Sequence, residues 1–278
     1  MEFYIKNSKL IPQKEWENLI DSFLKADSGE LQKALTEAIK KRIPQTRFGI
    51  LFSGGVDSSF ITAVCRRVKA DFVCYTAGTK NSPDIKYARI VAKYLGITLK
   101  VIELDLANIE NLAGEVIEIT GRHDIVTVGV GVVVLACIKN APEQIFFTGL
   151  GSEEIFAGYE RHEKARDINN ECKNGLIQMR ERDLMRDIPI AEKNDATLLT
   201  PFLDADVIAS AMKIKGEDKI RGGIKKFILR TIAERYLGEF AWRKKIAAQY
   251  GSGVVKALDK LAKINGFKYK KDYLTSLL

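Results

Sequence analysis

The sequence GILFSGGVDSS, at residues 49–59, predicts the fold of this chain. Its apolar residues 49–52 are typical of a buried strand, and the turn after them leads into residues 60–67, which show helical spacing. Gly54 and Gly55 let backbone amides approach an anion closely, and the start of a helix adds partial positive charge. A strand, a glycine turn and a helix in this order predict a phosphate-binding loop.

The side chains of this loop extend the prediction. The hydroxyls of Ser53, Ser58 and Ser59 add hydrogen-bond donors. The loop contains no lysine, unlike the mononucleotide loop that ends in Gly-Lys-Ser/Thr, so positive charge must come from elsewhere. Asp57 would repel a bare phosphate, but its carboxylate suits magnesium, which takes carboxylate and phosphate oxygens together. The alternative is that Ser53 and Asp57 only cap a helix.

Three more short apolar runs read as strands, at residues 72–76, 99–104 and 144–148, with helix-period segments between them. This alternation is typical of a parallel sheet with helical crossovers. Residues 125–136 are apolar apart from Thr127, and the two glycines among them leave helix and strand both open. The sequence therefore predicts a doubly wound α/β fold.

The N-terminal part is predicted to be small and to lack the strand-helix alternation of the rest of the chain. Residues 2–11 can pair as a hairpin around Asn7 and Ser8, and residues 13–25 and 30–41 show helical spacing. We expect this part to be a leader, because it is too short for an additional enzymatic domain.

The rest of the chain is predicted to form one unit. We place the leader at residues 1–45 and one α/β domain with a helical C-terminal region at residues 46–278, since no linker rich in glycine, serine or proline divides it. After Glu154 the pattern is mainly helical. Pro201 is expected to stop one helix and Asp204 to cap the next.

Charge and composition limit the function classes. The formal net charge is +8, yet basic and acidic residues alternate along residues 179–186, which predicts a solvated helix face rather than a nucleic-acid surface. A short basic cluster at residues 268–271 leaves contact with RNA open. The four cysteines lack CxxC spacing and the two histidines complete no zinc-ligand pattern, so we expect buried thiols and no zinc.

No membrane association is expected. The longest apolar stretch, residues 125–138, is interrupted by glycines and shorter than the ~20 apolar residues of a membrane-spanning helix. The first residues lack the basic and apolar regions of a signal peptide. These observations predict a cytoplasmic protein.

A second loop of the same construction follows the strand at residues 144–148. It reads GLGSEE, from Gly149 to Glu154, and combines glycines, a serine and acidic residues at the start of another helix. Ligands of open α/β sheets bind at the carboxyl ends of parallel strands, where both loops are predicted to lie. We therefore expect the two loops to form one site.

The first loop resembles the pyrophosphate loop of the N-type ATP pyrophosphatases. Residues 149–159 resemble the Gly-Glu-Gly-Ser-Asp-Glu-x-Phe-x-Gly-Tyr signature of the asparagine synthetase synthetase domain. Further motifs of that family are matched in the same order: Ser-Pro-Asp at 82–84, Pro-Phe-Leu-Asp at 201–204, Lys-x-x-Leu-Arg at 226–230 and the Arg-Lys-Lys region at 242–245. The resemblance covers residues 47–253.

The resemblance implies an enzyme that uses ATP and magnesium to adenylate a carboxylate, releases pyrophosphate, and transfers the acyl group to ammonia or an amine. It assigns catalysis to Lys226, Asp57 and Glu153, with Asp57 and Glu153 on the metal and Lys226 neutralising the departing pyrophosphate. It assigns substrate binding to Asp124, Leu150, Ser152 and Glu154, and a helix-capping role for Asp124 stays open as well. The implied ATP-binding residues are Leu51, Ser53, Gly54, Gly55, Asp57, Ser58, Ser59, Thr76, Gly149 and Gly151.

The sequence also departs from the family pattern. Leu150 replaces the glutamate between the loop glycines, and an apolar side chain cannot relay protons. Glu153 replaces an aspartate, and residues 128–129 offer no basic residue where one is expected, which puts aspartate as substrate in doubt. Residue two is Glu2 rather than the cysteine nucleophile of family members that carry a glutaminase domain.

No glutaminase domain is therefore expected here, and nitrogen would come from free ammonia, a separate glutaminase subunit or an amine. A homodimer is compatible with the sequence, which does not specify the assembly. Two other functions stay open: a tRNA-modifying adenylating enzyme of the same superfamily, and a non-catalytic nucleotide-binding relative.

Overall fold

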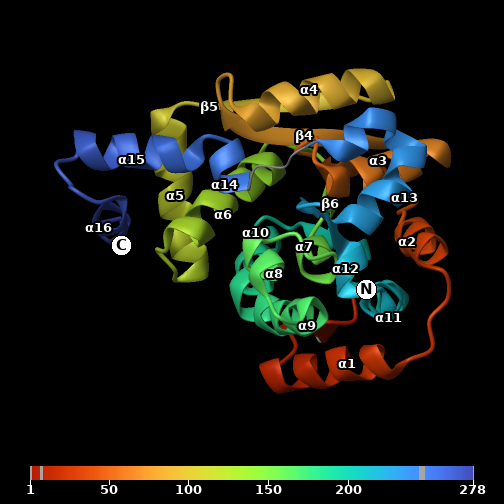
Figure 1. Ribbon diagram of the computed structural model, residues 1–278. Coiled ribbons are helices and arrows are strands. Elements are labelled where there is room, and N and C mark those ends of the chain that lie inside the picture. Colours follow the sequence, from red (N-terminus) through yellow and green to blue (C-terminus); the bar gives the residue numbers. More distant parts are fainter. Residues whose placement is uncertain (1, 7–8, 244–247, 278) are drawn as a thin grey trace.

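A five-stranded parallel sheet forms the centre of the computed structural model, which describes residues 2–6, 9–243 and 248–277 (Figure 1). The strand order is β5-β4-β3-β6-β7, and every neighbouring pair is parallel. The predicted parallel-sheet α/β fold is confirmed. The strands are β3 (Phe48–Leu51), β4 (Phe72–Thr79), β5 (Leu99–Leu104), β6 (Ile145–Phe147) and β7 (Thr197–Leu199).

Strand β7 was not predicted, because three residues are too few to show a pattern in the sequence. Helices cover the sheet: α4 (Pro83–Leu95) contacts β4 from one side, and α6 (Ile125–Lys139) contacts it from the other (Figure 1). Helices α3 (Val56–Arg67) and α5 (Leu106–Thr120) complete the crossovers.

The order of the sheet reverses between β3 and β6. Chain connections run outward from β3 through β4 to β5 on one side, and from β6 to β7 on the other. Gly49 pairs with Phe146, and a Cβ atom on Gly49 would lie only 2.3 Å from the Phe146 ring, so only glycine fits there. The loops after β3 and β6 consequently leave the sheet side by side, at the position where such folds bind ligands.

Helix α6 settles the ambiguity of residues 125–136 in favour of a helix. Asp124 caps it by accepting a hydrogen bond from the Thr127 amide at 2.9 Å. Gly131 lies so close to α5 that a Cβ atom would be 2.7 Å from Val116 Cγ1. The helix is apolar on most sides because it is a core helix.

The N-terminal leader packs against the C-terminal half of the chain. Strands β1 (Ile5–Lys6) and β2 (Lys9–Leu10) pair antiparallel as predicted, while the expected turn at Asn7 and Ser8 lies outside the described residues. The predicted helices are present as α1 (Gln13–Lys25) and α2 (Leu31–Lys40). The Trp16 indole donates to the Leu176 carbonyl at 2.8 Å, so the leader contributes to the main hydrophobic core.

The chain after the second loop is mainly helical, as predicted. The elements are α7 (Ser152–Ile155), α8 (Glu160–Lys164), α9 (Ile168–Met179), the π-helix η1 (Arg180–Leu184), α10 (Met185–Lys193), the 3-10 turn η2 (Pro201–Leu203), α11 (Ala205–Lys213), α12 (Gly216–Lys219), β8 (Ile220–Arg221), β9 (Ile224–Lys225), α13 (Phe227–Leu237), η3 (Gly238–Trp242), α14 (Ala248–Gly251), α15 (Val254–Ile264) and α16 (Lys270–Thr275).

The prediction that Pro201 stops a helix is wrong. Helix α10 already ends at Lys193, and β7 lies between it and the proline. The prediction for Asp204 is confirmed, since its carboxylate caps α11 by accepting from the Asp206 amide at 3.3 Å. Among the described residues, no individual helix is long and apolar enough to cross a bilayer; α5 and α6 pass that test only as a pair bent by 108°.

Candidate active site

The first loop folds back on itself between β3 and α3. The Ser58 hydroxyl accepts from the Ser53 amide at 3.3 Å and donates to the Gly55 carbonyl at 3.4 Å. Gly54 has a φ of +66°, and a Cβ atom there would lie 3.0 Å from the backbone of Tyr87 in α4. Helix α3 has Gly55 as its N-cap and no side-chain cap, so capping does not explain Ser53 and Asp57.

The second loop lies directly against the first. A Cβ atom on Gly149 would be 3.1 Å from the Asp57 Cβ atom, so a larger residue would fit between the loops only if Asp57 shifted by a few tenths of an ångström. Gly151 has a φ of +91°, and its Cβ position is 2.4 Å from Leu203, a residue of the Pro-Phe-Leu-Asp turn. Helix α7 begins immediately after it and carries Ser152, Glu153 and Glu154.

Lys226 joins the two loops. Its Nζ atom lies 2.7 Å from Asp57 Oδ1, 2.9 Å from Glu153 Oε1 and 2.9 Å from the Ser152 hydroxyl. The lysine is 2% exposed and therefore is not a surface residue. Its backbone φ is +58°, an uncommon conformation for a non-glycine residue that is enriched at functional sites.

Gly158 makes this arrangement possible. A Cβ atom at this position would lie 1.7 Å from Glu153 Oε2 and 2.5 Å from Lys226 Cε. The space left by the missing side chain is thus filled by the ion pair between Glu153 and Lys226. The glycine belongs to the second-loop motif quoted from the sequence, but nothing in the sequence indicated this role.

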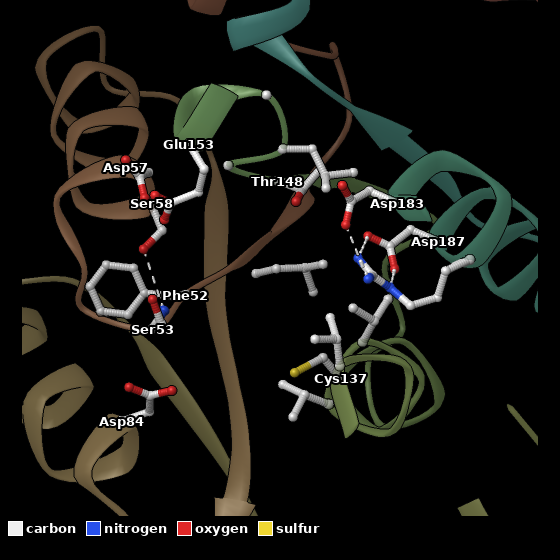
Figure 2. A pocket seen from close by; sticks show the side chains of 18 of the residues that line it. Phe52, Ser53, Asp57, Ser58, Asp84, Cys137, Thr148, Glu153, Asp183 and Asp187 are labelled. Atoms are coloured by element: carbon white, nitrogen blue, oxygen red, sulfur yellow. Dashed lines mark hydrogen bonds and ion pairs between the residues drawn. The ribbon is translucent and has the colours of Figure 1, made fainter. Parts of the chain in front are cut away.

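A cavity of about 410 Å³ opens beside the loops (Figure 2). Its walls come from the ends of β3 and β4, the two loops, one face of α6, and the segment from η1 to α10. Figure 2 shows Asp57, Ser58 and Ser53 on one side of it and Asp183 and Asp187 on the other. Its size is typical of a small-molecule site.

Most of the predicted site residues line this cavity. They are Leu51, Ser53, Asp57, Ser58, Thr76, Gly149, Leu150, Gly151, Glu153 and Glu154. Lys226 lies behind this lining and contacts Asp57 and Glu153, and the Ser152 hydroxyl accepts a hydrogen bond from Lys226. Gly54 and Gly55 shape the turn, and Ser59 is buried on α3.

Asp124 lies apart from the others. It caps α6, its side chain is 48% exposed, and its carboxylate lies 3.3 Å from Arg122. Binding of a substrate amino group by Asp124 stays a prediction, and among the described residues the cavity lining does not include this side chain.

Two other motif residues lie at the first loop. Arg243 donates to the Ser53 carbonyl at 3.0 Å and lies 3.6 Å from Asp84, the acid of the Ser-Pro-Asp motif, which lines the cavity. The rest of the predicted Arg-Lys-Lys region, from residue 244 on, lies outside the described residues. Arg243 thereby holds the first loop against α4.

The expectation that residues 179–186 form a solvated face is wrong. Asp183 and Arg186 are only 8% and 3% exposed, and both line the cavity. Arg182 lies 2.5 Å from Glu154 Oε1 and 2.6 Å from Asp183, and Arg186 lies 2.6 Å from Asp187. The sequence does carry a signal for this network. Arg182 and Arg186 are four residues apart, as are Asp183 and Asp187, so the four side chains lie on one side of a helix.

Burial affects the acids of this network. Desolvation, and then the charge of Asp183, raise the pKa of Glu154 to about 7, although Arg182 opposes the shift. Desolvation also raises the pKa of Asp187, partly offset by Arg186. These carboxylates are held close together in a poorly hydrated wall.

The residues present fit a magnesium ion bound together with a nucleotide. Magnesium in phosphate-transfer sites takes one or two carboxylates and completes its shell with phosphate oxygens and water. Asp57 and Glu153 supply two carboxylates that meet at Lys226. In the described part of the chain, no three or more His, Cys, Asp or Glu side chains form a group that could hold a metal by itself.

Comparison with known proteins agrees with this geometry. The family model described as asparagine synthase matches residues 30–196 and 167–266, which include both loops and Lys226. The chain belongs to the asparagine synthase family. The resemblance predicted from the two loops and the later motifs is therefore confirmed.

Individual members of the family align over most of this chain. A protein named putative asparagine synthetase [glutamine-hydrolyzing] 1, from Methanocaldococcus jannaschii, is 30% identical over 87% of this chain and 52% of its own length. Asparagine synthetase B [glutamine-hydrolyzing] of Escherichia coli is 29% identical over 82% of this chain and 45% of its own length. The chain thus spans about half the length of these relatives.

Proposed function

We propose that this chain is a carbon–nitrogen ligase that adenylates a carboxylate with ATP and then forms an amide bond with ammonia or an amine. The observation that carries the proposal is the junction at Lys226. A single buried cation contacts Asp57 of the first loop and Glu153 of the second, so both loops act on one ligand. Family membership supports the same reaction class.

The reaction that fits this site has two steps. A carboxylate oxygen bonds to the α-phosphorus of ATP while the bond from that phosphorus to the bridging oxygen breaks, and pyrophosphate leaves. The nitrogen lone pair then attacks the acyl carbon, AMP leaves with the bonding electrons, and the nitrogen loses a proton. Both steps gain from holding the reactants in contact.

Each part of the site has a place in this scheme. The amides and hydroxyls of the first loop would bind the phosphates at the start of α3. Asp57 and Glu153 would hold magnesium, which when bound neutralises phosphate charge. Lys226 would stabilise the charge that develops on the leaving pyrophosphate, as an electrostatic group fixed before the reaction.

Three nitrogen sources are compatible with the proposed reaction. Leu150 offers no group that could take a proton from the nucleophile. Free ammonia, a separate glutaminase subunit or an amine substrate each remain compatible with the site. The relatives whose names include glutamine hydrolysis make a glutamine-derived source plausible.

The test is a product assay. The purified chain is incubated with magnesium-ATP, ammonium and a mixture of carboxylates, and AMP and pyrophosphate are measured. Equal amounts of AMP and pyrophosphate, formed only when a carboxylate is present, are expected. Formation of ADP and phosphate instead would contradict adenylation. Turnover that requires transfer RNA would favour the tRNA-modifying alternative, and absence of both ATP binding and turnover would favour a non-catalytic relative.

A further inference from the structure

The wall of the cavity that α6 provides is apolar. Val126, Val130, Val133 and Cys137 line it, at spacings of four, three and four residues, which places them on one face of the helix. Val126 is 42% exposed although it is a valine, so this apolar face is open to a ligand. Leu150 of the second loop adds another apolar group to the lining.

The guanidinium groups of the cavity already have carboxylate partners. Arg161 Nε lies 2.9 Å from Glu171 Oε1, Arg182 pairs with Glu154 and Asp183, and Arg186 pairs with Asp183 and Asp187. Lys226 behind the lining is likewise paired. Arg182 and Arg186 thus already have carboxylate partners, whereas Nη2 of Arg161, itself a lining residue, has no hydrogen-bond partner among the described residues.

Carboxylates outnumber cations in the linked ion pairs opposite the phosphate loops. Glu154, Asp183 and Asp187 share two guanidinium groups, those of Arg182 and Arg186, while the third arginine of the lining, Arg161, pairs with Glu171. Asp183 and Asp187 are 8% and 3% exposed, so water screens their charge poorly. Figure 2 shows both on the far side of the cavity from Asp57.

We propose, on the basis of the function proposed above, that the activated carboxylate belongs to an amino acid with an apolar body rather than to a dicarboxylate. The ammonium group binds at Asp183 and Asp187, where it balances the surplus of negative charge. The carbon chain lies along the valines of α6, and the carboxylate points toward the phosphate loops. A second carboxylate in place of the ammonium would meet acids and an apolar surface.

The first test uses the unmodified chain and measures carboxylate-dependent exchange of labelled pyrophosphate into ATP. Three matched sets are compared: apolar α-, β- and ω-amino acids, the same acids without the amino group, and dicarboxylic amino acids such as aspartate and glutamate. We expect an amino acid of the first set to support exchange at least about tenfold better than its amine-free counterpart, which corresponds to ~1.4 kcal/mol.

The outcomes separate the two proposals. Exchange that is equal or faster with an amine-free acid, or with a dicarboxylate, overturns the substrate class while leaving adenylation intact. Exchange with no carboxylate of any set contradicts the proposed function itself, and the substrate class with it.

A variant tests the position of the ammonium group. Asp187→Asn keeps the shape of the side chain but removes the surplus charge, so the KM for the amino acid should rise about tenfold, a change of ~1.4 kcal/mol. The KM for ATP should change little. Glu192→Gln is the matched control, because it removes an exposed carboxylate from the same helix.

A folded Asp187→Asn protein with an unchanged KM for the amino acid would overturn this placement. Circular dichroism and urea unfolding establish whether the variant is folded. If it is not, the comparison of matched carboxylates with the unmodified chain still decides the substrate class.

Discussion

The Nζ atom of Lys226 lies 2.7 Å from Oδ1 of Asp57, although the two residues are 169 positions apart in the sequence. The same nitrogen contacts Glu153 and Ser152 of the second loop. Two loops, each of which carries a carboxylate but no lysine or arginine, thereby become one site with both signs of charge.

Lys226→Met should slow the chemical step much more than it weakens ATP binding. The lysine neutralises charge that appears only as pyrophosphate leaves, and loss of one such group lowers kcat by roughly 100-fold to 1,000-fold. Single-turnover AMP formation gives the rate, and titration calorimetry gives the affinity for ATP. Lys225→Met, which removes the neighbouring lysine, is the control. A loss confined to ATP affinity would show that Lys226 acts only in binding.

Asp57→Asn should abolish magnesium-dependent ATP cleavage and leave the fold intact. The amide keeps the size of the side chain but loses the charge that a hard cation requires. AMP release is measured as a function of magnesium concentration, with Asp71→Asn as an exposed control. Cleavage at the normal rate would show that the metal assignment of Asp57 is wrong.

Gly158→Ala should reduce activity without unfolding the protein. The new methyl group would occupy the position of the Glu153 carboxylate and crowd Lys226, so the ion pair between them must separate. The end of each side chain can move, which keeps the cost to stability small. Gly114→Ala is the control, because no atom lies within 4 Å of its Cβ position and alanine favours a helix. Unchanged kcat in Gly158→Ala would show that the junction tolerates disruption.

Stability should fall in acid because of His162. Burial, and then the charge of Arg161, lower the pKa of its imidazole from 6.5 to about 4. Its neutral Nδ1 atom accepts from the Tyr159 amide at 3.1 Å, a bond that the protonated ring cannot accept. The unfolded chain therefore binds a proton from about pH 6.5 downward while the folded chain does not, and the free energy of unfolding decreases as the pH falls toward 4.

Urea unfolding between pH 7 and pH 4 measures this effect. In His162→Asn the amide oxygen can still accept from the Tyr159 amide, but nothing titrates at this position. The decrease in stability over this range should therefore be smaller in the variant. Equal slopes in the two proteins would show that other groups account for the acid sensitivity.

The fold was predictable because its signals are local. The pattern of residues 49–59 already contained a strand, a glycine turn and a helix, and the structure has β3, the loop and α3 in these places. The strand at residues 99–104 and the helix at residues 13–25 were predicted with their observed bounds. Strand β7 was missed, because three residues that pair at one side of the sheet carry no periodicity of their own.

The acidic and basic residues of η1 show where local signals fail. Alternating charges around Arg182 and Asp183 indicate a solvated helix in an isolated segment. In the folded chain a π-helix follows α9. Its Arg182 and Asp183 side chains line the cavity, where Arg182 pairs with Glu154. The sequence shows the four-residue spacing of these charges but not their partner, which lies 28 residues earlier, nor their burial, which depends on packing.

The sequence by itself determined the two loops, their place at the ends of parallel strands, and the family, because each depends on residue types at short fixed spacings. Only the tertiary structure decided which charges meet: Lys226 with Asp57 and Glu153 at one end of the cavity, and Arg186 with Asp183 and Asp187 at the other. The physical reason is that an ion pair depends on distance in space and on exclusion of water, and both arise only when distant segments pack together.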